Sequence, residues 1–143
     1  MTAVLVWSPP PSARPLTIAE VMKVSPPTIR ADAHFAVAHA LMRGHGVRHL
    51  PVLDDERRLI GVLSHDDLYT AEATDAARAP VDFIAAALSA PPCAVAPGDL
   101  VTDVAREMSA RGLDCAVVVD RGQVVGLFTA SDSLALLTDR AAP

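Results

Sequence analysis

An internal repeat constrains this chain more than any other feature of its sequence. The stretch LIGVLSHDDL at 59–68 returns in similar form as VVGLFTASDSL at 124–134. The glycines of the two copies are 65 positions apart, and so are Asp67 and Asp132. Each copy reads as an apolar strand that contains a glycine, followed by Ser or Thr, two further residues, Asp and a helix. A fixed offset of this kind predicts two similar structural units in one chain.

The elements expected around the two copies occur in the same order in each half. In the first half they are a helix at 18–22, a strand at 28–31, a helix that Asp32 caps and that Gly44 and Gly46 end, strands at 49–53 and 59–63, and a helix at 66–77. In the second half they are a helix at 82–88, a strand at 93–96, a helix at 99–111 ended by Gly112, strands at 115–119 and 124–128, and a helix at 131–138. Thr17 and Glu20 have the spacing of a capping box for the first of these helices.

The predicted fold class is therefore α/β (α+β), with two repeats, each helix–β–α–β–β–α, packed with pseudo-twofold symmetry through their sheets. Units of 55 to 60 residues usually need a partner to bury a sheet face, and the second copy supplies it. The expected organisation is an N-terminal Pro-rich arm at 1–16, repeat 1 at 17–79, repeat 2 at 80–139 and a tail at 140–143. Trp7 in the arm has three open roles: it covers a sheet edge, it covers a partner subunit, or it is disordered.

Composition excludes several classes of function. Hydrophobic residues make up 51% of the 143 residues, which is ample for a packed core. The net charge of −5 and the lack of a basic run argue against a nucleic-acid-binding surface. Cys93 and Cys115 form neither a CxxC pair nor a zinc spacing, and no segment has the length of a membrane span or signal peptide. We expect a cytoplasmic protein in which both cysteines are small buried hydrophobes.

The Ser/Thr-x-x-Asp unit has two compatible interpretations. A hydroxyl at the N-cap with an acidic residue three positions later is a capping box, which is the commoner role for one isolated copy. A carboxylate can also chelate the two hydroxyls of a ribose, and the N–H groups at a helix start favour phosphate. The glycine before the unit allows close approach of either another backbone or a ligand.

The strand Leu50-Pro51-Val52 and both Gly-x-x-Ser/Thr-x-x-Asp segments resemble the cystathionine-β-synthase (CBS) domain. Two such repeats in tandem, at about 17–139, resemble a CBS pair, or Bateman module, here as a stand-alone protein. The resemblance implies a regulatory module that binds an adenosine-containing ligand (AMP, ADP, ATP or S-adenosylmethionine) in the cleft between the repeats. It also implies that two modules often pair, and the Ala- and Leu-rich closing helices agree with a homodimer.

The resemblance also implies which residues surround each cleft, because each repeat completes the cleft of the other. The cleft expected to bind better would contain Asp132, Thr129, Thr28, Val47, Arg48 and His49. The second, weaker cleft would contain Asp67, Ser64, Cys93, Leu113 and Cys115, with Asp114 beside them. The preference follows from charge, since Arg48 and His49 suit a phosphate whereas Asp114 repels one. Arg48 and His49 as ordinary solvated surface residues remain an equal alternative, and Val117 in place of Pro51 puts the shape of the second cleft in doubt.

The predicted function is to sense an adenosyl ligand and to pass that state in trans to an effector protein, with no required cofactor. A rival prediction is a structural or protein-interaction dimer with vestigial clefts. An enzyme or a metal protein is less favoured, because the chain has no nucleophile elbow, P-loop or HExxH motif. All five histidines lie in the first repeat, at spacings that do not bring them to one point.

Overall fold

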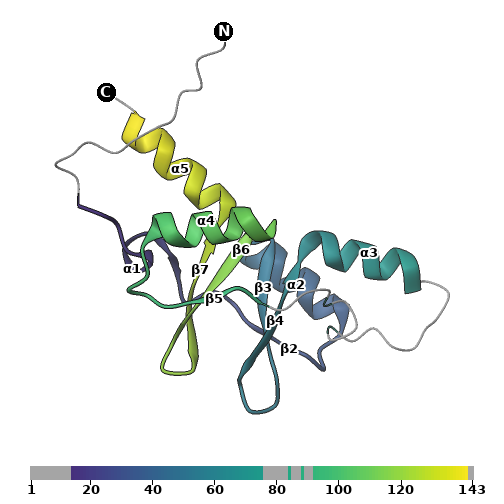
Figure 1. The fold of residues 1–143 in the computed structure, drawn as a ribbon. Coiled ribbons are helices and arrows are strands. Elements are labelled where there is room, and N and C mark those ends of the chain that lie inside the picture. Colours follow the sequence, from purple (N-terminus) through teal and green to yellow (C-terminus); the bar gives the residue numbers. More distant parts are fainter. Residues whose placement is uncertain (1–13, 76–83, 85–87, 89–91, 142–143) are drawn as a thin grey trace, which may run out of the picture.

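The computed structural model describes residues 14–75, 84, 88 and 92–141. In these ranges the chain forms two sheets flanked by helices (Figure 1), which confirms the predicted α/β fold. The elements of the first half are α1 (Ile18–Val21), β1 (Lys23–Val24), β2 (Ile29–Arg30), α2 (Phe35–His45), β3 (His49–Leu53), β4 (Leu59–Ser64) and α3 (His65–Asp75). Those of the second half are β5 (Ala94–Val95), α4 (Val101–Arg111), β6 (Cys115–Asp120), β7 (Gln123–Thr129) and α5 (Ala130–Ala141).

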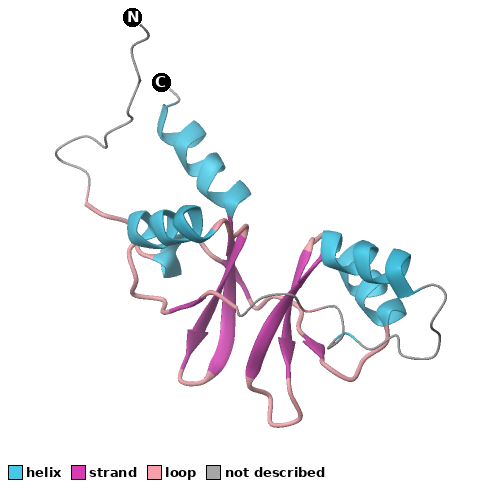
Figure 2. Ribbon diagram, turned by 45° about the vertical axis from the view of Figure 1, so that its right-hand side comes forward, coloured by secondary structure: helices cyan, strands magenta, loops and turns pink. Residues whose placement is uncertain are grey.

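The two sheets occupy the middle of the molecule and the helices lie outside them (Figure 2). One sheet has the order β2-β3-β4 and contains the antiparallel hairpin β3–β4; the other has the order β1-β7-β6-β5 and contains the antiparallel hairpin β6–β7. Alternate residues of each hairpin point to opposite faces. One face packs on the helices of its own repeat, and the other packs on the second sheet through Cys115, Val117 and Leu127 against Leu59 and Val62. The inner faces of the two repeats thus form a third core between the sheets.

Each repeat sends its leading residues into the other repeat. Ile18 of α1 is fully buried among side chains of the second repeat, and β1 pairs in antiparallel register with β7. In return, Ile84 is fully buried in the core of the first repeat, where its backbone N–H donates to the Ala33 carbonyl at 3.0 Å. We call residues 17–24 the first lead segment, and Ile84 with Leu88 the second. The sequence predicted neither β1 nor this exchange.

The exchange explains the glycine of each repeated motif. A Cβ atom on Gly126 would lie 2.9 Å from Met22 Cγ and 3.1 Å from the Lys23 carbonyl oxygen, both in the first lead segment. A Cβ atom on Gly61 would lie 2.9 Å from Leu88 Cδ1 in the second. The sequence left open close approach of another backbone or of a ligand. At Gly126 a backbone atom of the other repeat lies close, whereas at Gly61 the near atoms belong to the Leu88 side chain.

Helix ends follow the predictions in part. The capping box of Thr17 and Glu20 is present at the start of α1. Gly46 and Gly112 end α2 and α4 with φ of +64°, a left-handed conformation that glycine adopts at low cost, whereas Gly44 lies within α2.

The predicted cap at Asp32 is wrong. The N-cap of α2 is His34, and the helix begins at Phe35. Asp32 lies in a turn instead, where its carboxylate accepts a hydrogen bond from Arg30 Nε at 3.1 Å. Asp99 likewise lies before its helix, whose N-cap is Leu100. Its carboxylate accepts a hydrogen bond from the Ala96 N–H at 2.9 Å and thereby closes a turn before α4. Both acidic residues stabilise the turn before the helix rather than its first residue.

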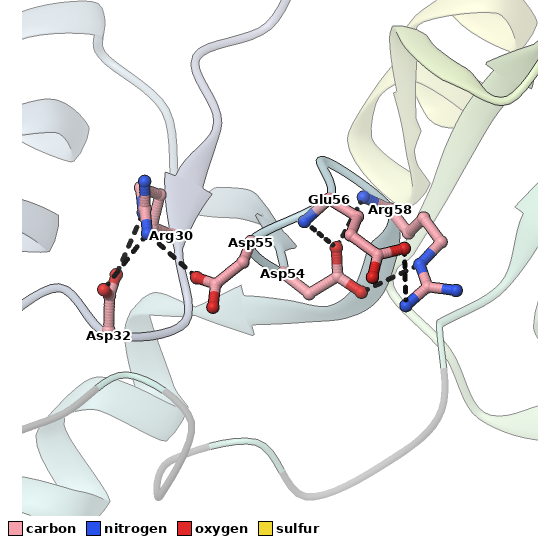
Figure 3. A network of polar contacts seen from close by, with 6 residues as sticks. All are labelled: Arg30, Asp32, Asp54, Asp55, Glu56 and Arg58. Carbon is pink, nitrogen blue, oxygen red and sulfur yellow. Dashed lines mark hydrogen bonds and ion pairs between the residues drawn. The ribbon is translucent and has the colours of Figure 1, made fainter.

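A network of charged side chains fastens the β3–β4 hairpin at the end of the strands away from the repeated motif (Figure 3). The Asp54 carboxylate accepts from the backbone N–H groups of Glu56 and Arg58, both at 2.9 Å. Arg30 reaches across to Asp55 at 2.9 Å and thereby ties β2 to this turn. Exposed ion pairs of this kind contribute about 0–1 kcal/mol each, so the network sets the geometry of the turn more than the stability of the fold.

Several predictions lie outside the described residues. They are the arm at 1–13 with Trp7, most of the helix expected at 82–88, and residues 76–77 at the end of the third expected helix.

Candidate ligand-binding clefts

Both repeated motifs form helix caps. At the start of α5, Asp132 Oδ2 accepts hydrogen bonds from the backbone N–H and the hydroxyl of Thr129, each at 2.9 Å. The Thr129 hydroxyl in turn accepts from the Asp132 N–H at 3.3 Å. At the start of α3, the Ser64 hydroxyl accepts from the Asp67 N–H at 3.0 Å, and the Ser64 N–H donates to Asp67 Oδ2 at 3.4 Å. The capping interpretation is therefore correct for both copies.

The second carboxylate oxygen of Asp132 takes no part in these cap hydrogen bonds and faces Lys23 instead. Asp132 Oδ1 lies 3.7 Å from Lys23 Nζ, and its side chain is 19% exposed. Lys23 comes from the first lead segment, so this ion pair joins the two repeats. The capped carboxylate thus faces a cation at the boundary of the two repeats.

A cavity of about 150 Å³ lies beside Asp132, and we call it the Asp132 cleft. Repeat 1 contributes Lys23, Gly46, Val47, Arg48 and His49, and repeat 2 contributes Leu127, Thr129 and Ser131. Of the residues predicted for this cleft, Val47, Arg48, His49 and Thr129 line it, and Asp132 adjoins it through Lys23. Neither Asp132 nor Thr28 is among the lining residues.

A larger cavity, of about 400 Å³, lies beside the other motif, and we call it the Asp67 cleft. The predicted residues Asp67, Ser64, Cys93, Leu113 and Cys115 all line it. Asp114 lines it as expected, and the further lining residues are His49, Val62, Pro92, Arg111 and Gly112. The second cleft is thus built from both repeats and is the roomier of the two.

A third cavity of about 300 Å³, which we call the central cavity, lies where the starts of α3 and α5 meet. Ser64, His65 and Asp66 line it from one repeat, and Thr129, Ala130 and Ser131 from the other. Arg48, His49 and Asp114 complete its wall. Because Arg48, His49, Thr129 and Ser131 also line the Asp132 cleft, the two cavities share a wall. Two helix N-termini directed at one cavity favour negative charge there, whereas the Asp66 and Asp114 carboxylates on its wall oppose it.

The electrostatics of the clefts differ from the expectation at His49. Burial lowers the pKa of this imidazole, and the nearby Arg48 lowers it further, although Asp114, Asp67 and Asp66 act in the opposite direction. A histidine with a lowered pKa is mainly neutral at pH 7. The positive charge of the Asp132 cleft therefore comes from Arg48 and Lys23 rather than from His49.

The two cysteines are buried, as predicted. Burial raises the pKa of the Cys115 thiol to about 12, and Cys93, Asp132 and Asp114 raise it further. Burial also raises the pKa of Cys93. Both side chains are therefore neutral thiols that give the Asp67 cleft a weakly polar wall.

Sequence reasoning missed two cations at the clefts. Lys23 lies on a strand of two residues, which is too short for an alternating pattern to reveal. Arg111 ends α4, pairs with Glu107 at 3.5 Å and lines the Asp67 cleft. A basic residue in the last turn of a helix has an ordinary explanation in the helix dipole, so nothing in its spacing pointed to a cleft.

Within residues 14–75, 84, 88 and 92–141, no group of three His, Cys, Asp or Glu side chains is placed to hold a metal ion. In the same ranges no helix has the length and apolar character needed to cross a membrane.

Comparison with known proteins identifies the family. The family model of the CBS domain matches this chain twice, at residues 18–74 and 84–134. The chain belongs to the CBS domain family. Inosine-5'-monophosphate dehydrogenase of Aquifex aeolicus is 27% identical to it over 113 residues, which are 78% of this chain and 22% of that enzyme. The chain thus spans less than a quarter of the length of this relative.

Solved structures share the fold. The CBS domain pair of the protein MJ0100, solved with 5'-methylthioadenosine and S-adenosyl-L-methionine, superposes with a TM-score of 0.80 at 22% identity and covers 89% of this chain and 99% of that one. The protein CBSX2, solved with AMP, superposes with a TM-score of 0.72 at 21% identity and covers 86% of this chain and 96% of that one. At this level of identity the likeness establishes the arrangement of two CBS repeats.

Proposed function

We propose that this chain is a regulatory module that binds an adenosine-containing ligand between its two repeats. The observation that carries the proposal is the position of the capped carboxylates: Asp67 lines one cavity between the repeats, and Asp132 pairs with Lys23, which lines another. A ligand in either cleft would contact both repeats at once, so its binding would depend on how they are packed. The adenosyl ligands of MJ0100 and CBSX2 support this class of ligand.

The charges of the clefts favour different ligands. Lys23 and Arg48 line the Asp132 cleft, and this cleft shares a wall with the central cavity at the starts of α3 and α5. We therefore propose that the Asp132 cleft binds a phosphate-bearing nucleotide, such as AMP, ADP or ATP, more tightly than the Asp67 cleft does. Because this cleft of about 150 Å³ is smaller than most small-molecule sites, the nucleoside part would lie along Val47 and Leu127 and the phosphate part would extend past Arg48 into the central cavity. We propose that Thr28, which directly precedes β2, contributes to this site from outside its lining.

The Asp67 cleft has more room but two aspartates, Asp67 and Asp114, against the single cation Arg111. This balance disfavours a phosphate and suits an adenosyl group whose charge is positive, as in S-adenosylmethionine. The neutral thiols Cys93 and Cys115 would contact such a ligand as apolar surface.

The output of the module is proposed to be a change in contacts with another protein. No catalytic step is proposed. We propose a cytoplasmic homodimer that passes its ligand state to an effector protein in trans. The coupling would equal the difference in ligand affinity between the two packings of the repeats.

Calorimetry on Asp132→Ala and Asp67→Ala tests the assignment, and each variant is the matched control of the other because both remove a helix cap. With AMP as ligand, we expect Asp132→Ala to weaken binding by about 10- to 100-fold, which corresponds to the loss of charged hydrogen bonds to a ribose. Asp67→Ala should leave AMP binding within about twofold. Loss of AMP binding in Asp67→Ala but not in Asp132→Ala would reverse the assignment.

A thermal-shift screen against AMP, ADP, ATP and S-adenosylmethionine separates the proposal from its rival. A ligand present at 100 times its Kd should stabilise the chain by about 2.7 kcal/mol. No shift with any of them at millimolar concentration would favour an interaction dimer with vestigial clefts.

A further inference from the structure

A fourth cavity lies between α2 and α3 of the first repeat and adjoins the Asp132 cleft, with which it shares Gly46, Val47 and Arg48. It has a volume of about 370 Å³. Its wall includes His39, Met42 and Arg43 of α2, Arg48 from the following loop, and His65 and Tyr69 of α3. We call it the α2–α3 cavity. Its volume is within the range of small-molecule sites in proteins.

Two arginines of this cavity form no salt bridge with any described residue. Arg43 and Arg48 both line the cavity, and neither has a carboxylate within ion-pair distance in that part of the chain. By contrast, Arg106 and Arg111 of α4 each pair with an acidic residue on their own helix, at 3.8 and 3.5 Å. Two guanidinium groups on one cavity present planar sets of N–H donors without a bound acceptor, which is the arrangement that binds oxyanions.

The polar wall of the cavity is held in place by ring contacts. Tyr69 packs edge-on against His65, with ring centroids 4.6 Å apart, and against His39 at 6.2 Å. His39 Nε2 is hydrogen bonded to Glu72 Oε1 of α3, which connects the two helices again. Contacts of this geometry are favourable for aromatic pairs and restrict the rings. The imidazole and phenol donors on the wall are therefore positioned before any ligand arrives, which lowers the entropy cost of their part in binding.

The second repeat shows that the fold does not require these residues. Counting 66 positions along α2 and its loop, Arg43 corresponds to Ser109 and Arg48 to Asp114. Counting 65 positions along α3, His65 corresponds to Ala130 and Tyr69 to Leu134. The same pair of helices thus forms in the second repeat without the arginines, the imidazole or the phenol. A structural role common to both repeats does not explain the cationic and aromatic set.

We propose that the α2–α3 cavity is a separate binding site for a small molecule that carries a phosphate-type oxyanion. The two arginines would bind the anion, and His65 and Tyr69 would add hydrogen-bond donors at its edge. Arg48 also lines the Asp132 cleft and the central cavity. If the Asp132 cleft binds nucleotide as proposed above, the two anions compete for one guanidinium, and each weakens the binding of the other.

Pyrophosphate is the probe, titrated into the full chain by calorimetry at low salt without any nucleotide. Arg43→Gln should weaken the binding of pyrophosphate at least about tenfold, because it removes a charged donor pair. Arg106→Gln is the matched control, since it removes a helix arginine far from the cavity in sequence and should leave the affinity unchanged. Arg43→Lys keeps the charge without the planar donor set and should recover part of the affinity. Higher salt should weaken the binding.

Two outcomes would overturn the proposal. If Lys23→Gln abolishes pyrophosphate binding while Arg43→Gln leaves it intact, the anion binds in the Asp132 cleft. If Arg43→Gln dissociates a dimer but does not change the pyrophosphate affinity, the cavity holds an acidic side chain of a second copy instead. Neither outcome depends on nucleotide binding, so this site can fail while the proposed function stands, and the reverse also holds.

Discussion

Replacing Gly126 with alanine tests the contact between the first lead segment and the second repeat. The added methyl group would lie 2.9 Å from Met22 Cγ and 3.1 Å from the Lys23 carbonyl oxygen. Carbon atoms in proteins prefer separations of about 3.5–4.0 Å, so the methyl group is about 0.6 Å too close to Met22 Cγ, and it overlaps Met22 Sδ still more. The Met22 side chain can rotate away. The Lys23 carbonyl moves only with β1, whose pairing with β7 fixes it.

The cost follows from two opposing effects. Overpacking at a fixed site costs about 1–3 kcal/mol, whereas replacing glycine with alanine restricts the unfolded chain and returns about 0.4–1 kcal/mol. We therefore expect Gly126→Ala to lower the free energy of unfolding by about 1–2 kcal/mol. For a chain of this size, that lowers Tm by about 3–8 °C.

Gly61→Ala is the matched control, because the two glycines occupy equivalent positions in the repeats. Its methyl group would meet the tip of the Leu88 side chain, at 2.9 Å from Cδ1, and no backbone atom is among its nearest neighbours. A flexible tip can shift, so Gly61→Ala should change stability by less than about 1 kcal/mol.

Urea unfolding followed by circular dichroism, at one protein concentration, gives both values. A double-mutant cycle of Gly126→Ala with Met22→Ala should show coupling, because removing the Met22 side chain relieves part of the clash. The reasoning is refuted if Gly126→Ala is as stable as the parent chain, or if Gly61→Ala is the more destabilised variant.

Two further predictions concern titration. The pKa of the Cys115 thiol is raised to about 12 from its usual 9.0, so the unfolded chain loses this proton at lower pH than the folded chain does. The contribution of Cys115 to the free energy of unfolding is therefore complete below pH 9 and falls as the pH rises toward 12. Chemical unfolding of Cys115→Ala at pH 8 to 10.5 should show a smaller decrease of this free energy with pH. An unchanged decrease would contradict the burial of the thiol. The pKa of Glu20 is lowered from 4.5 to about 2, chiefly by Arg14 and also by the Thr17 N–H, so its contribution to stability is present above pH 4.5 and is lost as the pH falls toward 2. Glu20→Gln should reduce the loss of Tm between pH 5 and pH 3, and an equal loss in both proteins would show that the capping box has no role in acid unfolding.

The parts of the fold that local patterns encode were predictable. The offset of 65 predicted two repeats, because the same strand, cap and helix recur around Asp67 and Asp132. Both caps are present in the structure. The glycine ends of α2 and α4 were also predictable, since a left-handed residue is favourable only for a few residue types. Helix starts were less certain, because an aspartate can cap a helix or close the turn before it, as Asp32 shows.

Contacts between distant segments could not be predicted in this way. Nothing in the two residues of β1 indicates that they pair with β7, about 100 positions later, and so Lys23 was missed at the Asp132 cleft. The charge of His49 was not predictable from the sequence either, because it depends on burial, which lowers the pKa of the imidazole. The residues of the Asp67 cleft were placed by the family resemblance, and all of them line one cavity in the structure.

The exchange of lead segments determines whether one repeat of this chain can fold without the other. Each hydrophobic core contains a residue from the other half, Ile18 in one and Ile84 in the other. A gene fragment that encodes one motif with its own helices and strands would lack the residue that completes its core. Neither repeat is therefore expected to form a stable unit without the lead segment of the other. A substitution in α1 should therefore destabilise the core of the second repeat, where Ile18 is buried.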